Sequence, residues 1–274
     1  MGILMKFRSL LLLSVLACGW SNHAQAAIVN VTVTFQNLAA TNSVSFAPLR
    51  VGFHNGTFDA FNIGTTANAA IVSIAEGGSG SAWFPAFAAA EPNAVLGTVG
   101  GALVPNGNTG GGFASSASQT FTIDTNVNRF FTFASMVIPS NDLFIGNDNP
   151  AAFQILDNAG NLLISQINQT AAQIWDANSE VADPANAAFV VGGVNGNRTP
   201  ENGVVAFDFS ELNVFNGLTT GAGYVFNHGL VGATNIGRIS FAVTAVPEPS
   251  SMALVGLFGI GVVVKRFRKK TAKL

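Results

Sequence analysis

The most regular feature of the sequence is an alternation of apolar and polar side chains in two stretches, residues 28–36 and residues 236–246. From Val29 to Phe35, every second residue is valine or phenylalanine, and the residues between them are asparagine or threonine. Successive side chains of a strand point to opposite faces, so this period of two predicts half-buried antiparallel strands with one solvated face. The second stretch is predicted to close the domain.

Further apolar stretches recur along the chain and are separated by turns rich in Gly and Asn. Strands are predicted at 44–53 with an interruption at Pro48, at 119–124, 130–138, 153–156, 162–166 and 171–175, and more weakly at 187–194, 203–209 and 224–227. Many short strands with few helices favour an all-β fold, here an antiparallel β-sandwich with short helices in its connections. Since no internal repeat or interior linker is found, a single domain at residues 27–245 is predicted.

Two Ala-rich stretches, 67–75 and 82–90, break the strand pattern and are predicted to form short helices. Residues 95–118 are instead rich in Gly, Asn and Ser, and they lack the Gly-Lys-Ser/Thr of a phosphate-binding loop. They are predicted to form a long flexible surface loop.

The N-terminus has the pattern of a secretory signal peptide, which is set apart from the fold. Two basic residues precede an apolar run at residues 10–17, and Ala24 and Ala26 form an A-x-A cleavage site. Cleavage after Ala26 is predicted, and a lipoprotein cleavage box ending at Cys18 is the alternative. Because Cys18 is the only cysteine, the mature chain would have no disulfide, no zinc–thiolate site and no cysteine nucleophile.

The C-terminus carries Pro247, Glu248 and Pro249, then a glycine-dotted apolar run at residues 252–264 and a cluster of Lys and Arg. The apolar run is short for a membrane-spanning helix, which needs about 20 apolar residues. Residues 246–274 resemble the PEP-CTERM sorting signal of Gram-negative bacteria. The resemblance implies recognition by an exosortase, transient or lasting membrane contact through this segment, and delivery to the cell surface or an exopolysaccharide matrix. A plain single-pass anchor is the alternative.

The charge of the chain changes once both ends are set aside, because every lysine lies in them. Residues 27–245 keep four arginines against thirteen acidic residues, a formal charge of −9. With no basic patch to neutralise phosphates, nucleic acid is excluded as a partner.

Two stretches of the chain carry candidate ligands for a metal ion. Pro139 cannot donate to a strand ladder, so the strand at 130–138 should end there and leave Asp142 at a strand-to-loop corner. Asp142 could ligate a hard cation there, or cap the turn through an Asx hydrogen bond. Asp176, Asn178 and Glu180 place oxygen-bearing side chains at alternating positions, which suits calcium, although the spacing is not that of an EF-hand. A solvated acidic loop is the alternative.

Three stretches of the chain together resemble the spondin domain, the N-terminal module of the F-spondin and mindin matrix proteins. They are His54-Asn55 with residues 58–61 and Gly64, residues 135–142 with Gly146, and residues 175–177 with Glu180. The resemblance spans most of residues 28–246. It implies an antiparallel β-sandwich that binds calcium, with a structural role, through acidic residues in two loops.

Carried over by position, the calcium ligands that the resemblance implies are Asp142, Asp176 and Glu180. Asn178 and Ser179 stand where many family members have Gly and Thr, and Asn tolerates a left-handed φ better than most residues. Three converging carboxylates without a cation would repel one another and raise their pKa values. A divalent ion would remove that conflict and join the two loops.

The sequence therefore favours a non-enzymatic, calcium-binding protein of the cell surface or extracellular matrix, with a role in adhesion or matrix attachment. Beside the exosortase and the secretion machinery, the candidate partners are glycans of the exopolysaccharide and surface proteins. One alternative is a carbohydrate-binding module, with Trp83, Trp175 and Tyr224 as candidate stacking residues. The other is a secreted hydrolase that would use His54 and Asp59 beside a serine, although the sequence has no Gly-x-Ser-x-Gly elbow.

Overall fold

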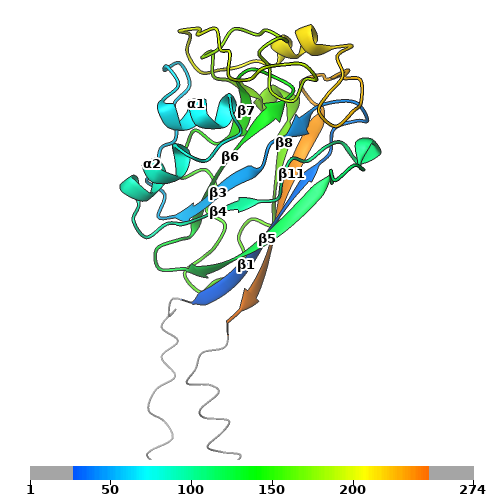
Figure 1. Cartoon of the computed structure of the whole chain (residues 1–274). Helices are drawn as coiled ribbons and strands as arrows, with labels where there is room; N and C mark the ends of the chain where they lie inside the picture. The colour runs from blue at the N-terminus through cyan, green and yellow to red at the C-terminus, as the bar shows by residue number, and fades with distance from the viewer. Residues whose placement is uncertain (1–26, 247–274) are drawn as a thin grey trace, which may run out of the picture.

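The computed structural model describes residues 27–246, so the predicted signal peptide and sorting segment lie outside the described residues. The described chain forms two antiparallel β-sheets with short helices beside them (Figure 1), which confirms the predicted all-β sandwich. The two ends of the described chain lie at the same end of the molecule (Figure 1). Within residues 27–246, every helix is too short or too polar to traverse a bilayer.

The first sheet contains both of the alternating stretches as its central strands. Its order is β5 (Ser116–Asp124), β1 (Ile28–Asn37), β11 (Asn235–Ala245) and β8 (Gln166–Thr170). Val33 lies opposite Phe241 of β11 and Gln119 of β5. The first and last strands of the domain are therefore hydrogen-bonded neighbours, which explains why the two ends of the described chain emerge together.

The second sheet carries most of the residues discussed below. Its order is β10 (Ala206–Phe207), β9 (Trp175–Asp176), β7 (Leu143–Gly146), β6 (Phe130–Ile138), β3 (Leu49–His54) and β4 (Val95–Val99), and β2 (Ser45–Phe46) also pairs with β6. The break between β2 and β3 falls at Pro48, as predicted. The short strand β10 forms one edge of this sheet.

The core lies between the two sheets and is built from the apolar side of each alternating pattern. The apolar residues of β1 from Val29 to Phe35 are buried, whereas the polar residues between them are partly exposed. Phe241 of the first sheet contacts Phe131 of the second edge-on, with ring centroids 4.9 Å apart. Burying these faces supplies the main driving force for folding, at about 25 cal/mol per Å² of apolar surface.

The two predicted helices are present as α1 (Ala69–Ala75) and α2 (Trp83–Ala90). Both lie beside the second sheet, next to its strands β3 and β6 (Figure 1). The side chain of Asn68 accepts a hydrogen bond from the backbone N–H of Ile71 and thereby caps α1. Trp83 and Phe87 of α2 are buried in a second apolar cluster on this side. Strand β6 is consequently buried on both faces, which explains its largely apolar sequence.

The prediction of a long flexible loop at residues 95–118 is wrong at both of its ends. Residues 95–99 form β4, and β5 begins at Ser116. Gly97 of β4 has a packing role, because a Cβ there would lie 2.4 Å from Cε1 of Phe121. The glycine thus admits the Phe121 ring against the strand, a long-range contact that local composition could not indicate.

Several predicted strands in the second half of the chain differ from the observed elements. The strand predicted at 162–166 lies instead at Gln166–Thr170. Of the strand predicted at 171–175, the first three residues form the 3₁₀ helix η2 (Ala171–Gln173), and β9 begins only at Trp175. Residues 153–156, 187–194 and 224–227 form isolated bridges and no ladder. Of residues 203–209, two form β10, and η3 (Ser210–Phe215) follows; η1 (Asn106–Asn108) is a third 3₁₀ turn.

Candidate metal site

Asp142 and Asp176 lie side by side because two short strands pair next to them. Strand β6 ends at Ile138, before Pro139, and Asp142 occupies the corner that leads into β7. Asp176 is the last residue of β9, and in the register of β7 with β9 it lies opposite Leu143. The backbone N–H of Ala177 donates to the carbonyl oxygen of Asp142 at 3.3 Å. The fold thus joins two corners that are far apart in sequence.

The carboxylate of Asp142 is fully buried, with a relative exposure of 0%. Its Oδ2 atom accepts hydrogen bonds from the backbone N–H groups of Ser179 at 2.7 Å and Glu180 at 3.0 Å, and from the Ser179 hydroxyl at 3.2 Å. Its Oδ1 atom is buried without a hydrogen-bond partner among the described residues. A buried oxygen without a partner is costly, so Oδ1 calls for a ligand or a proton.

The third carboxylate of the site belongs to Glu211, which lies on η3. Oxygen atoms of Asp142, Asp176 and Glu211 all lie within 4.8 Å of one another. Within the described part of the chain, Oε2 of Glu211 is also buried and has no hydrogen-bond partner. Three carboxylates with two unsatisfied buried oxygens match the donor chemistry of a hard divalent cation, which binds several oxygen ligands.

The electrostatics of the three carboxylates show the cost of bringing them together without a cation. Burial, and then the negative charge of Asp142, raise the pKa of Asp176 to about 7. Burial, followed by the charges of Asp176 and Asp142, raises the pKa of Glu211 to about 8. Burial also raises the pKa of Asp142, although the hydrogen bonds from Ser179 and Glu180 oppose that shift. Each shift means that the site disfavours uncompensated negative charge.

Glu180 lies next to this group, but its carboxylate has other contacts. Its Oε1 atom accepts a hydrogen bond from Nδ2 of Asn141 at 3.1 Å, and its Oε2 atom is buried without a partner in the described range. The direct contact of Glu180 with the site is its backbone N–H, which donates to Asp142. Of the three predicted ligands, the structure therefore brings the carboxylates of Asp142 and Asp176 together and completes the group with Glu211.

The loop between these ligands adopts the conformation that its asparagine permits. Asn178 has a φ of 48°, in the left-handed region that Asn tolerates better than most residues. Its backbone N–H donates to Oδ1 of Asp176 at 2.7 Å, and its side chain donates to the carbonyl oxygen of Val204. Asn178 thus ties the loop to the segment that leads into β10.

Arg198, which follows the loop of Ser179 and Glu180 in sequence, does not pair with the three carboxylates among the described salt bridges. Its guanidinium forms an ion pair with Glu76, the C-cap residue of α1. Oε1 of Glu76 also accepts a hydrogen bond from the Ser179 hydroxyl, so the ion pair buttresses the loop that binds Asp142. Arg198 compensates Glu76 directly, and the group of three carboxylates keeps its own excess of negative charge.

Sequence reasoning missed Glu211, although a weak signal was present. Asp208 lies within the predicted strand at 203–209, and Glu211 lies two residues after its end. Two acids near the end of a strand are a common surface pattern, and the position of Glu211 depends on how η3 folds. Asp208 directs that fold by accepting hydrogen bonds from the backbone N–H and the hydroxyl of Ser210.

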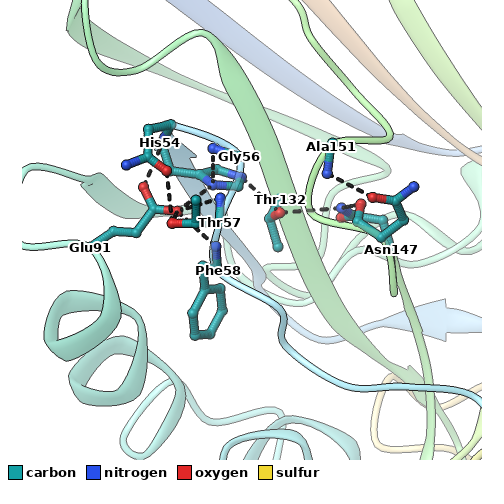
Figure 2. A network of polar contacts seen from close by, with 10 residues as sticks. His54, Gly56, Thr57, Phe58, Glu91, Thr132, Asn147 and Ala151 are labelled. Atoms are coloured by element: carbon teal, nitrogen blue, oxygen red, sulfur yellow. Dashed lines mark hydrogen bonds and ion pairs between the residues drawn. The ribbon is translucent and has the colours of Figure 1, made fainter.

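His54, the histidine of the hydrolase alternative, lies in a network separate from the three carboxylates (Figure 2). His54 is fully buried; its Nδ1 lies 3.1 Å from Oε1 of Glu91 and its Nε2 lies 2.9 Å from the Thr132 hydroxyl. Asp59 instead accepts a hydrogen bond from Asn62. Burial lowers the pKa of His54, although Glu91 opposes the shift. The hydrogen-bond partners of His54 in the described chain do not include the serine that the alternative requires.

Glu91 holds the loop after β3 in place. Its carboxylate accepts hydrogen bonds from the backbone N–H groups of Asn55, Thr57 and Phe58 at 2.7–2.8 Å, as Figure 2 shows for the last two. Burial alone would raise the pKa of Glu91, but the hydrogen bonds from Asn55, Thr57 and His54 outweigh it and lower that pKa. The network is a structural clamp between α2 and the end of β3.

Replacement of Glu91 should therefore destabilise the domain. We expect Glu91→Gln to lower the free energy of unfolding at pH 7 by about 1–3 kcal/mol, because an amide N–H₂ would face backbone donors. The folded pKa lies below the ordinary value of 4.5, so the stabilisation by the ionised carboxylate is complete above about pH 4.5 and is lost as the pH falls through the lowered folded pKa. Urea unfolding at pH 7 and in strong acid, with Asp148→Asn as the control, measures both effects. An equal loss of stability at both pH values would contradict this role.

The aromatic residues of the carbohydrate alternative are buried. Relative exposures are 0% for Trp83, 4% for Trp175 and 8% for Tyr224. Trp175 donates from Nε1 to the carbonyl oxygen of Gly146, and the Tyr224 hydroxyl donates to the carbonyl oxygen of Ser43. These three side chains are core anchors and cannot stack on an external sugar.

Comparison with protein families identifies the C-terminal signal. Residues 245–270 match the model of the PEP-CTERM protein-sorting motif, which includes Pro247, Glu248 and Pro249. The match confirms the predicted sorting signal and marks the chain as one of the exosortase-sorted proteins, which are exported and processed at the cell envelope. No curated protein matches the chain. The resemblance of residues 28–246 to the spondin domain stays a prediction.

Proposed function

We propose that the domain at residues 27–245 is a non-enzymatic, calcium-binding module that an exosortase pathway delivers to the surface or exopolysaccharide matrix of a Gram-negative bacterium. Its role there is adhesion or matrix attachment. The sorting motif supports the route of export. The resemblance to the spondin domain supports the ion and the role.

The observation that carries the ion assignment is the group formed by Asp142, Asp176 and Glu211. Their oxygens lie within 4.8 Å of one another, and Oδ1 of Asp142 and Oε2 of Glu211 are buried without partners in the described chain. All three ligands are carboxylates, a donor set that favours calcium over the nitrogen- and sulfur-preferring transition metals. When bound, calcium supplies positive charge that compensates the three carboxylates.

The three ligands come from different elements, so a bound ion would join these elements to one another. Asp142 lies at the corner between β6 and β7, Asp176 ends β9, and Glu211 lies on η3. One ion would hold these elements together at the end of the molecule opposite the two termini, where the loops of residues 178–232 gather (Figure 1). The sorting segment follows the opposite end, so these loops would project away from the membrane during sorting.

A calcium titration tests the assignment. Isothermal titration of calcium chloride into protein treated with a chelator should give one site per chain. Asp176→Asn should remove the binding, because it deletes the charge of a carboxylate whose oxygen lies within 4.8 Å of those of both other ligands, whereas Asp148→Asn, in the turn after β7, should retain it. Absence of binding up to about 10 mM calcium, beyond even the weak extracellular modules, would contradict the proposal.

The sorting route has a separate test. Deletion of residues 247–274 should release the protein into the medium, because the segment matched by the sorting motif would be lost. Fractionation of cells and medium measures the change, and a variant with Pro247 and Pro249 replaced by Ala serves as a finer probe of the same motif. Retention of the deleted form at the cell surface would show that another part of the chain holds it there.

A further inference from the structure

An exposed aromatic ring lies at the edge of the second sheet. Phe207 is the last residue of the edge strand β10, and its relative exposure is 49%. The ring stacks on Trp175, with centroids 3.7 Å apart and an angle of 23° between the planes. Trp175 is in turn stacked on Phe144 and contacted edge-on by Phe61. One face of the Phe207 ring is therefore fixed against the core, and the ring cannot turn inward.

The surroundings of Phe207 combine apolar and neutral polar groups. The loop of residues 62–65 runs beside β10, because Gly64 donates to the carbonyl oxygen of Val205 and Val205 donates to that of Thr65. Ile63 and Val204 in these two segments are exposed. The same loop presents the amide of Asn62, which donates to the exposed carboxylate of Asp59.

The charges near this surface exclude an anionic partner. Asp208 follows Phe207 directly, Asp59 is hydrogen-bonded to Asn62 of the neighbouring loop, and both acids are exposed. Three of the four arginines in residues 27–246 are engaged elsewhere: Arg50 with Thr98 and Gly78, Arg198 with Glu76, and Arg238 with Asn168. An acidic polysaccharide or a phosphate-rich surface would therefore be repelled.

The size of the apolar surface argues against a protein partner. Three exposed apolar side chains fall short of the roughly 800 Å² per partner that a stable protein interface buries. A single ring with a fixed face and a few polar groups at its margin instead fits a small, flat ligand unit. The face of an aromatic ring carries partial negative charge, which attracts the polarised C–H groups of a sugar ring.

We propose that Phe207 is the stacking platform of a binding site for a neutral hexopyranose chain. One sugar ring packs on the exposed face of the phenyl ring, and Asn62 and Asp59 offer a donor and acceptors to its hydroxyl groups. The three residues that the sequence suggested for stacking on sugars, Trp83, Trp175 and Tyr224, are buried. The proposal therefore assigns the carbohydrate contact to Phe207, which the sequence analysis did not single out.

The platform is coupled to the ion site, and this part of the inference rests on the proposed function. Ala206, the neighbour of Phe207, lies opposite Asp176 in the register of β10 with β9. Glu211 follows Phe207 by four residues on η3. An ion held by Asp176 and Glu211 would fix both ends of the segment that carries the ring, so calcium should strengthen glycan binding.

Glycan titrations with the full-length protein test the inference. The probes are cellohexaose, mannohexaose and maltohexaose as neutral chains, and an alginate hexamer as the anionic one. We expect at least one neutral hexaose to bind, Phe207→Ala to weaken it at least about tenfold, and Phe207→Trp to retain it. Val231→Ala, which shortens another exposed apolar side chain, is the matched control and should bind like the wild type.

The outcomes separate the glycan site from the ion site. Phe207→Ala should leave the calcium affinity unchanged, because Phe207 is not a ligand. If the protein binds no calcium but binds a neutral hexaose through Phe207, the glycan site stands and the coupling to the ion is overturned. Binding of alginate alone, no binding of any neutral hexaose up to about 10 mM, or equal binding by Phe207→Ala would overturn the glycan site itself.

Discussion

Removal of calcium with a chelator should lower the melting temperature of the wild-type protein by about 5–10 °C. Calcium at about 100 times its dissociation constant stabilises the folded state by about 2.7 kcal/mol, and each kcal/mol shifts the melting temperature of a domain of this size by about 2–4 °C. The shift would arise because the proposed ion requires Asp142, Asp176 and Glu211 to be held together, as they are in the folded state. Thermal unfolding in calcium and in chelator measures it directly.

In the same experiment, the difference in melting temperature between Asp176→Asn and the wild type should change sign between chelator and calcium. In chelator, the variant should melt above the wild type, because it removes one of three neighbouring carboxylates that repel one another. In calcium, it should melt below the wild type, because it has lost a ligand. Asp148→Asn should follow the wild type in both conditions. A wild-type melting curve that chelation leaves unchanged would refute the role of the ion in holding the loops.

Glu211→Gln should weaken calcium binding by at least about 100-fold, whereas Glu180→Gln should change it little. Even partners in the outer shell of a metal site are worth about 10–100-fold in affinity, and Glu211 places an oxygen within 4.8 Å of those of Asp142 and Asp176. Glu180 contacts Asp142 through its backbone N–H, which the substitution preserves. Titration of both variants compares the two glutamates.

The two substitutions are matched in chemistry, since each exchanges a carboxylate for an amide of the same shape. Glu180→Gln also keeps the oxygen that accepts from Nδ2 of Asn141. If Glu180→Gln abolished binding and Glu211→Gln did not, the ligand set implied by the spondin resemblance would be correct, and the set drawn from the geometry would be wrong.

The fold was predictable where local pattern and burial coincide. The alternation in β1 and β11 has one buried and one solvated face, so the period of two is visible in the sequence, and the two strands are neighbours in one sheet. Strand β4 was missed because its Gly97 reflects the close approach of Phe121 from a distant strand. From composition alone, Gly97 was interpreted as part of a flexible loop.

The site was predictable only in part, for a similar reason. The corner after Pro139 and the motif beginning at Asp176 are local features, and the pairing of β7 with β9 joins them. Glu211 reaches the site from an irregular 3₁₀ helix, which leaves no periodic signal in the sequence. Glu180 is close in sequence to Asp176, but its backbone contacts the site while its carboxylate contacts Asn141.

A crystal structure of the protein grown in calcium chloride, with anomalous diffraction data, tests the ion site most directly. We expect one anomalous peak within about 2.3–2.6 Å of a carboxylate oxygen from each of Asp142, Asp176 and Glu211, the usual range for calcium. Well-ordered carboxylates at these three positions with no peak between them, in crystals that contain calcium, would contradict the assignment.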